Sequence, residues 1–208
     1  ADRATGDEPR ILVYASLDPS HDAFVLALQR IGLGCTMVTG WTSLGAALTN
    51  DGPWDLVIVN SYSMYPTTAS LDALTLHVDT GGSLIYADWS LFSYPAHDLL
   101  ARLGVSYQSS FTQPYDFAAA TPLHRCFRRP NEIAALHWNL NQHNYDGQFV
   151  SVLDGASGLA TFQGHPEAAA LVLGASGRTV FNAFQASNFQ ADDDGDGLLD
   201  VVELAENE

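Results

Sequence analysis

The carboxylates in the last part of the chain are spaced as calcium ligands. In the segment 192–203 they occupy positions 1, 3, 5, 9 and 12 of a loop, and glycine occupies position 6. Calcium takes about six to eight oxygen ligands, and a short loop supplies them only if alternate side chains point inward. The pattern therefore predicts a calcium site, with ligands from the carboxylates of Asp192, Asp194, Asp196, Asp200 and Glu203 and the backbone carbonyl of Leu198.

A solvated acidic tail is the ordinary alternative. Such a tail has no need of Gly197 at the sharp turn or of Glu203 at the closing position. The segment 199–206 can form a helix after the loop, whereas 186–190 is too short for one before it. The loop thus resembles the one-sided calcium loops of thrombospondin type 3 repeats and dockerins, and the EF-hand loop in its spacing. The resemblance implies Ca²⁺ as a cofactor and an extracellular or cell-surface location, where calcium is millimolar.

Composition limits the possible partners. The chain has 208 residues and a net charge of −16, and its eight basic residues are all arginine, so nucleic-acid binding is not expected. No apolar run reaches the roughly 18 residues that span a membrane, and no signal peptide is expected in this chain. Two cysteines, Cys35 and Cys126, are compatible either with one disulfide in an exported protein or with two buried thiols.

Apolar strands alternate with helices over the first half of the chain, which predicts a mainly parallel sheet covered by helices on both faces, a flavodoxin-like α/β fold. Residues 1–9 are predicted to be a linker. The expected strands are 11–15, 35–38, 54–60 and 83–88, and the expected helices are 21–31, 42–48, 70–78 and 96–103.

The second half departs from this alternation. Residues 106–148 are rich in aromatic and amide side chains, and we expect an irregular excursion with one helix at 131–138. Four further strands are expected at 149–153, 159–162, 169–173 and 179–184. The domain then spans 10–190, and 191–208 form the calcium loop and a short helix.

The order of these elements, together with two local motifs, resembles the class I glutamine amidotransferase-like superfamily. The segment 177–181 is similar to its late G-R-V-V strand, and 163–167 reads Q-G-H-P-E, which matches its histidine and glutamate motif. The resemblance implies a Cys-His-Glu triad with the cysteine directly after a strand. Here the strand 84–87 leads into Asp88, so the nucleophile is absent and we expect no catalysis.

Polar residues after the strands are candidates for a second site, because ligands of open α/β sheets bind in the crevice at the carboxyl ends of the strands. These residues are Asp18, His21, Asn60 and Asp88. The ordinary alternative is that Asp18 caps a helix.

Two functions follow from these observations. The first is an exported, calcium-binding, non-catalytic structural or interaction protein of bacterial type, which contacts other domains or copies of itself in a surface assembly or filament. The second is a hydrolase or carbohydrate-binding domain that uses the crevice. A pocket that gathers His, Asp and Ser would favour the second, and a crevice filled by Trp89 or Phe92 would favour the first.

Overall fold

The computed structural model describes residues 8–16, 18–62, 64–133, 135–139 and 147–208. The predicted linker at 1–9 therefore lies mostly outside the described residues. None of the described helices is long and apolar enough to cross a membrane.

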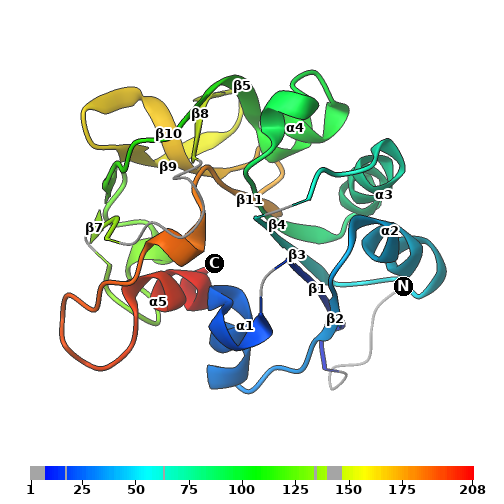
Figure 1. The fold of residues 1–208 in the computed structure, drawn as a ribbon, viewed down its shortest axis with the longest axis horizontal. Coiled ribbons are helices and arrows are strands. Elements are labelled where there is room, and N and C mark those ends of the chain that lie inside the picture. Colours follow the sequence, from blue (N-terminus) through cyan, green and yellow to red (C-terminus); the bar gives the residue numbers. More distant parts are fainter. Residues whose placement is uncertain (1–7, 17, 63, 134, 140–146) are drawn as a thin grey trace.

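One half of the main sheet is parallel, as the alternation of strands and helices predicted. Its strands lie in the order β2-β1-β3-β4-β11, which is a flavodoxin-like order (Figure 1). The strands are β1 (Ile11–Ala15), β2 (Thr36–Val38), β3 (Leu56–Ser61), β4 (Ser83–Asp88) and β11 (Thr179–Asn182). All but the edge strand β2 are almost wholly buried, which explains their continuous apolar runs.

Helices cover both faces of this half. α2 (Trp41–Asn50), α3 (Thr68–Asp79) and α4 (Asp98–Leu103) lie on one face, and α1 (Ala23–Arg30) and α5 (Asp200–Asn207) lie together on the other (Figure 1). Short 3₁₀ turns, η1 (Pro19–His21), η2 (Leu91–Ser93), η3 (Arg125–Phe127) and η4 (Ala186–Asn188), link the elements.

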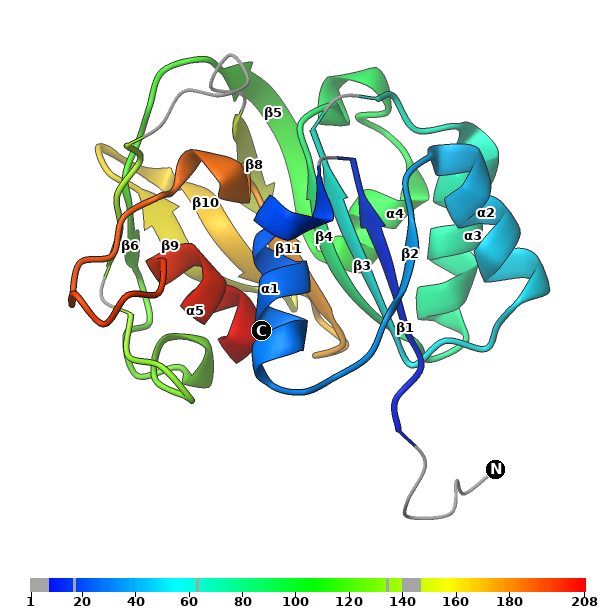
Figure 2. The same ribbon diagram turned by 60° about the horizontal axis from the view of Figure 1, so that its bottom comes forward.

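The other half of the same sheet is antiparallel. β10 (His165–Leu173) pairs with β11, and the sheet then continues through β9 (Ser157–Phe162), β6 (Phe117–Ala119) and β7 (Ala135–Leu136) (Figure 2). A separate antiparallel pair, β5 (Val105–Phe111) with β8 (Gly147–Val152), lies against β10. The sheet is therefore mixed, with its parallel part next to the helices.

The predicted helix at 131–138 is wrong. Ala135 and Leu136 form the edge strand β7, in register with Ala118 and Phe117 of β6. Leu136 and Trp138 are both buried, and a spacing of two residues is the pattern of a strand. Ile133 lies three residues before Leu136, and this spacing resembles the pattern of a helix. The excursion at 106–148 is also more ordered than expected, because it supplies β5, β6, β7 and the start of β8.

Helix α5 is an integral part of the domain. Val201, Val202 and Leu204 are each at most 4% exposed. At the end of the helix, the Asn207 amide nitrogen donates to the carbonyls of Cys126 and Asn131, and its oxygen accepts from the Asn131 amide. The apolar stripe of this helix thus packs on its own chain, which stabilises a helix too short to be stable alone in water.

Both cysteines are free thiols: Cys126 is buried and Cys35 is half-buried. Cys35 and Cys126 therefore do not form a disulfide in this structure.

The side chain of Asn207 makes a testable contribution to stability. Asn207→Ala leaves two buried carbonyls and one amide without their partner, and we expect the free energy of unfolding to fall by about 1–3 kcal/mol. Urea unfolding measures this change. Asn50→Ala, at an exposed position at the end of α2, is the matched control. Equal losses in the two variants would mean that α5 is not anchored in this way.

Candidate metal centre and the crevice of the sheet

The predicted calcium loop is the connection between the last parallel strand and the last helix. After β11 and the η4 turn, the chain runs through 189–199 without a helix and enters α5 at Asp200 (Figure 1). The one-sided arrangement expected from the sequence is thus present. The far end of the loop is joined to the core, because α5 packs beside α1.

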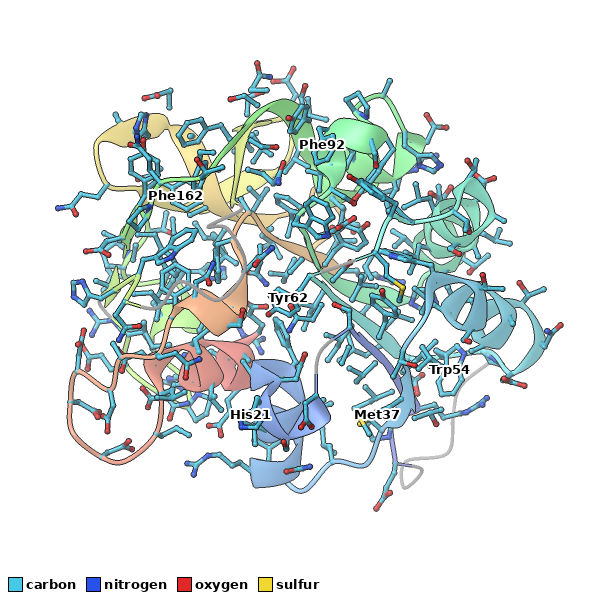
Figure 3. The ribbon with its side chains drawn as sticks, in the orientation of Figure 1. His21, Met37, Trp54, Tyr62, Phe92 and Phe162 are labelled. Atoms are coloured by element: carbon cyan, nitrogen blue, oxygen red, sulfur yellow. The ribbon has the colours of Figure 1, made fainter. Side chains whose placement is uncertain are left out.

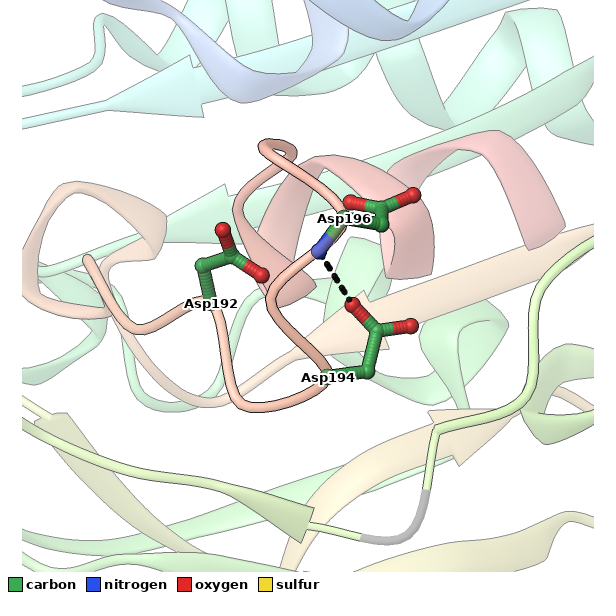
Figure 4. A group of neighbouring side chains, drawn as sticks. All are labelled: Asp192, Asp194 and Asp196. Atoms are coloured by element: carbon green, nitrogen blue, oxygen red, sulfur yellow. Dashed lines mark hydrogen bonds between the residues drawn. The ribbon is translucent and has the colours of Figure 1, made fainter.

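Three of the predicted ligands converge. Asp192, Asp194 and Asp196 each offer a carboxylate oxygen, and these oxygens lie within 4.8 Å of one another (Figure 4). Backbone amides turn the first side chain inward, since Asp192 accepts from the amides of Gly195 at 2.8 Å and Gly197 at 3.0 Å. Both glycines have a positive φ, 74° and 92°, which glycine adopts at little cost.

The next two side chains are held in the same way. Asp194 accepts from the Asp196 amide at 3.1 Å, and Asp196 accepts from the Leu198 amide at 2.7 Å. Leu198 packs its side chain against the core. Each turn of the loop thus fixes one carboxylate and so sets the alternation that calcium coordination requires.

Two of the three remaining predicted ligands, Asp200 and Glu203, lie in the first turn of α5 and are buried, at 6% and 5% exposure. One oxygen of Asp200 accepts from the Asp193 amide at 3.2 Å, and the other has no hydrogen-bond partner. Burial, with repulsion from Asp194 and Asp196, raises the pKa of Glu203 to about 7. Burial and the aspartates of the loop also raise the pKa of Asp200.

These properties test whether the residues fit a metal. A buried carboxylate oxygen without a partner is costly, and a divalent cation removes both the desolvation penalty and the mutual repulsion. Hard oxygen donors are the ligands that calcium prefers, and the three carboxylates that converge, those of Asp192, Asp194 and Asp196, offer such donors, whereas Asp200 and Glu203 are not part of that close group. The residues therefore fit Ca²⁺.

The four predicted crevice residues do not form one pocket. Asn60 of β3 is in register with Ala87 of β4, and Ser61 is in register with Asp88, so the side chains of Asn60 and Asp88 point to opposite faces of the sheet. Asp18 directly before η1 and His21 at its end are both exposed. Figure 3 shows His21, Tyr62 at the end of β3 and Phe92 on η2 well apart.

Helix α1 is capped by a residue that the sequence analysis missed. Asp22 accepts from the amides of Phe24 and Val25, and its second oxygen accepts from the Asn60 side chain at 2.7 Å. Asp18 accepts from Ser20 and so stabilises the η1 turn instead. The signal was available, because Asp22 directly precedes the apolar run of α1 at the N-cap position.

Asp88 is the centre of a buried polar cluster. It is 4% exposed and accepts hydrogen bonds from the Ser90 amide and hydroxyl and from the hydroxyls of Tyr86 and Tyr94. Burial raises the pKa of Asp88 to about 6 despite these donors. Tyr86 stands two residues before Asp88 on β4, so the strand period places both on the same face. No histidine is among the hydrogen-bond partners of Asp88 in the described part of the chain.

Aromatic rings gather beside this cluster. The ring centroids of Tyr65, Trp89 and Phe92 lie 5.2 to 6.0 Å apart, and Tyr65 and Phe92 are 57% and 43% exposed. The Gln148 side chain donates to the Trp89 carbonyl. The position directly after β4 is thus occupied by Trp89 and its aromatic neighbours.

The Q-G-H-P-E motif lies elsewhere, on a hairpin. Gln163 and Gly164 form the turn between β9 and β10, and His165 begins β10. The His165 ring packs 4.7 Å from both Tyr115 and Phe149, and its Nδ1 lies 3.2 Å from Glu167. Since β10 and β11 separate β9 from β4 in the sheet, the motif belongs to the antiparallel half.

Comparison with solved structures supports the fold assignment. A cytoplasmic protein from Salmonella typhimurium has a TM-score of 0.61 at 12% identity, with 96% of each chain covered. A Thermoplasma acidophilum protein assigned as part of GMP synthase has a TM-score of 0.59 at 10% identity, covering 97% of this chain and 92% of that one. PurLQS from Thermotoga maritima has a TM-score of 0.54 at 13% identity, with 97% of each chain covered.

The chain therefore has an α/β fold similar to class I glutamine amidotransferase-like proteins, as the order of its elements indicated. At these identities the likeness concerns the fold alone. No protein-family model matches the sequence, and no curated protein matches it.

The buried carboxyl of Asp88 predicts a pH dependence. Its folded pKa of about 6 exceeds the usual value near 3.9, so between these pH values the folded state binds more protons than the unfolded state. Stability from this group is present below about pH 4, falls by about 2–3 kcal/mol as the pH rises to 6, and is level above that.

Urea unfolding of wild type and Asp88→Asn between pH 4 and 7 measures this linkage. The substitution should make the decline in stability with pH shallower, whatever it does to absolute stability. Asp154→Asn, in an exposed turn, should keep the wild-type slope. The same slope for Asp88→Asn and wild type would refute the assignment.

Proposed function

We propose that this protein is an exported, calcium-binding, non-catalytic structural or interaction protein, in which calcium holds the last helix against the domain. The observation that carries the proposal is the pair of buried carboxylates, Asp200 and Glu203, in the first turn of α5 beside the converging trio of the loop. The convergence of Asp192, Asp194 and Asp196, and an oxygen of Asp200 with no hydrogen-bond partner among the described residues, support this proposal of a hard divalent cation.

The role of calcium follows from the position of the loop. Without the cation, the trio repels Asp200 and Glu203 and opposes the docking of α5. With calcium bound, the repulsion becomes attraction, and the free energy of binding adds to that of folding because the unfolded chain does not hold the ligands together. Calcium would then act as an internal staple of the fold.

The proposed location of the protein rests on the calcium affinity expected for this loop. One-sided loops of this kind bind calcium weakly, with a Kd of about 10⁻⁴ to 10⁻³ M in extracellular modules, and only millimolar calcium fills them. This is the basis for proposing that the protein works outside the cell or at its surface.

The proposed contact surface is the exposed aromatic cluster. Since the apolar stripe of α5 is buried within the domain, a partner domain or a second copy must bind elsewhere. Tyr65, Phe92 and the adjacent Met64, at 42% exposure, form an exposed apolar group, and aromatic side chains and methionine are enriched at protein interfaces. Carbohydrate binding on the same rings is the second candidate, because Tyr65 and Phe92 are 57% and 43% exposed.

Absence of catalysis is proposed from the position after β4. Asp88 is buried and fully hydrogen-bonded there, and it cannot act as the thiolate that attacks a glutamine amide. His165 packs between two aromatic rings on a different part of the sheet.

Calorimetric titration with calcium tests the metal site. We expect binding in wild type and a loss of at least tenfold in affinity in Glu203→Gln, which removes the carboxylate that closes the loop. Calcium at ten to a hundred times its Kd should raise the free energy of unfolding of wild type by about 1–3 kcal/mol. Glu167→Gln, an exposed glutamate outside the loop, is the control. The absence of calcium heat in wild type would refute the site.

Ammonia release from glutamine tests the absence of catalysis. We expect the rate to stay at the level of buffer alone and to be the same in wild type and His165→Ala, because no nucleophile faces that histidine. Turnover in wild type that His165→Ala abolishes would overturn this part of the proposal.

A further inference from the structure

We infer that His137 is a positioning residue of the calcium loop: it ties Asp193 to Asp116 and so keeps the middle one of three consecutive aspartates out of the metal site. This inference rests on the proposed calcium function. His137 was not singled out as a functional residue from the sequence, and it lies directly after the edge strand β7.

The geometry places His137 between two carboxylates. Its Nδ1 lies 2.9 Å from Asp116, and its Nε2 lies 3.2 Å from Asp193. The hydrogen bond with Asp116, with the nearby charges of Asp193 and Asp200, raises the pKa of His137. The ring therefore joins the start of the calcium loop to the residue that precedes β6.

Asp116 is itself firmly held. Its second oxygen accepts from the Trp138 amide at 2.8 Å, and its carbonyl accepts from the Gln163 amide at 2.7 Å. Isolated surface ion pairs contribute little, but a pair with one member fixed by backbone hydrogen bonds loses less side-chain entropy on forming. The link thus anchors the loop to the sheet through β6 and β9.

Neighbouring contacts strengthen the same connection. The Asn139 amide donates to the Asn188 carbonyl at 3.2 Å, and the Asn139 side chain accepts from the Gln190 amide at 2.7 Å. The Trp138 ring packs 5.3 Å from that of Phe189. Residues 137–139, which we name the clasp, therefore run beside 188–193, the segment that leads into the loop.

The clasp determines which aspartates of the loop can face the metal. Asp192, Asp193 and Asp194 are consecutive, and a metal could draw any of them inward. Alternation requires the first and third to face the metal and the second to face away. The contact of His137 Nε2 with the Asp193 carboxylate at 3.2 Å holds this second side chain, while the amides of Gly195 and Gly197 hold that of Asp192.

The sign of the effect on calcium affinity separates this role from a simple charge effect. If the clasp positions the loop, His137→Gln weakens calcium binding, because more of the free protein must reorganise. If His137 acts only as a nearby positive charge, its removal strengthens the binding of a cation. His137→Arg keeps a charge that can reach both carboxylates and should restore the affinity.

The experiment combines two measurements on the full chain. Amide hydrogen exchange in chelator, which needs no calcium, should be about three- to tenfold faster at 188–193 in His137→Gln and in Asp193→Asn than in wild type, and close to wild type in His137→Arg. Calcium calorimetry should show losses of affinity of similar size in His137→Gln and in Asp193→Asn. The double variant with both substitutions should show no further loss. His97→Gln, which loses a comparable contact with Asp72, is the control.

Unchanged exchange at 188–193 in His137→Gln, tighter calcium binding, or additive losses in the double variant would each overturn the clasp. These outcomes differ from failure of the calcium proposal. If wild type binds no calcium, the proposed function falls, and hydrogen exchange in chelator still decides whether His137 orders the loop.

Discussion

The structure depends on a conflict at the start of α5. The helix must pack beside α1 to cover the sheet, and Val201, Val202 and Leu204 provide the apolar surface for that packing. Its first turn, however, buries Asp200 and Glu203 next to three more carboxylates. Negative charge suits a helix N-terminus, but this benefit is about 1 kcal/mol or less per group and cannot offset the burial of several carboxylates together. A divalent cation would resolve the conflict, which is why we propose that calcium acts on folding rather than on a separate tail.

The conflict also explains how the second half of the chain is arranged. The loop and the helix that follows it are both tied to the segment between β5 and β8: His137 and Asn139 contact the start of the loop, and Asn131 contacts the last residue of α5. The Asn131 side chain also donates to Glu206, which accepts from Arg30 of α1. A loop that joins a strand to a helix in an ordinary doubly wound fold is thus surrounded by inserted structure. Changes at the loop are therefore expected to reach the outer strands as well as α5.

Sequence predicted the parts of this molecule that depend on local pattern. Buried parallel strands are continuous apolar runs and were recognisable from the sequence, whereas the calcium loop, which is defined by spacing within a dozen residues, stays a prediction. The helix predicted at 131–138 failed because Leu136 is placed by pairing with Phe117, which is distant in sequence. The expectation that the crevice residues lie together failed for a related reason. Asn60 and Asp88 both lie at the ends of strands, but the register of β3 and β4 puts their side chains on opposite faces of the sheet. The role of His137 could not be predicted, since Asp116 and Asp193 meet it only through tertiary packing.

The same comparison separates fold from function in this chain. The overall path resembles amidotransferase-like structures over nearly its full length, yet the two positions that would carry that chemistry have other uses. Asp88 is the acceptor of a tyrosine and serine network, and His165 is packed between rings on a hairpin. A buried carboxylate with four donors stabilises one conformation of the strand end, and a nucleophile needs the opposite, an open face toward substrate. The hydrogen bonds of Asp88 thus hold the end of β4 in one conformation. The acidic loop and the exposed rings are the features that could bind a ligand, and neither includes Asp88, which stands at the position of the family nucleophile.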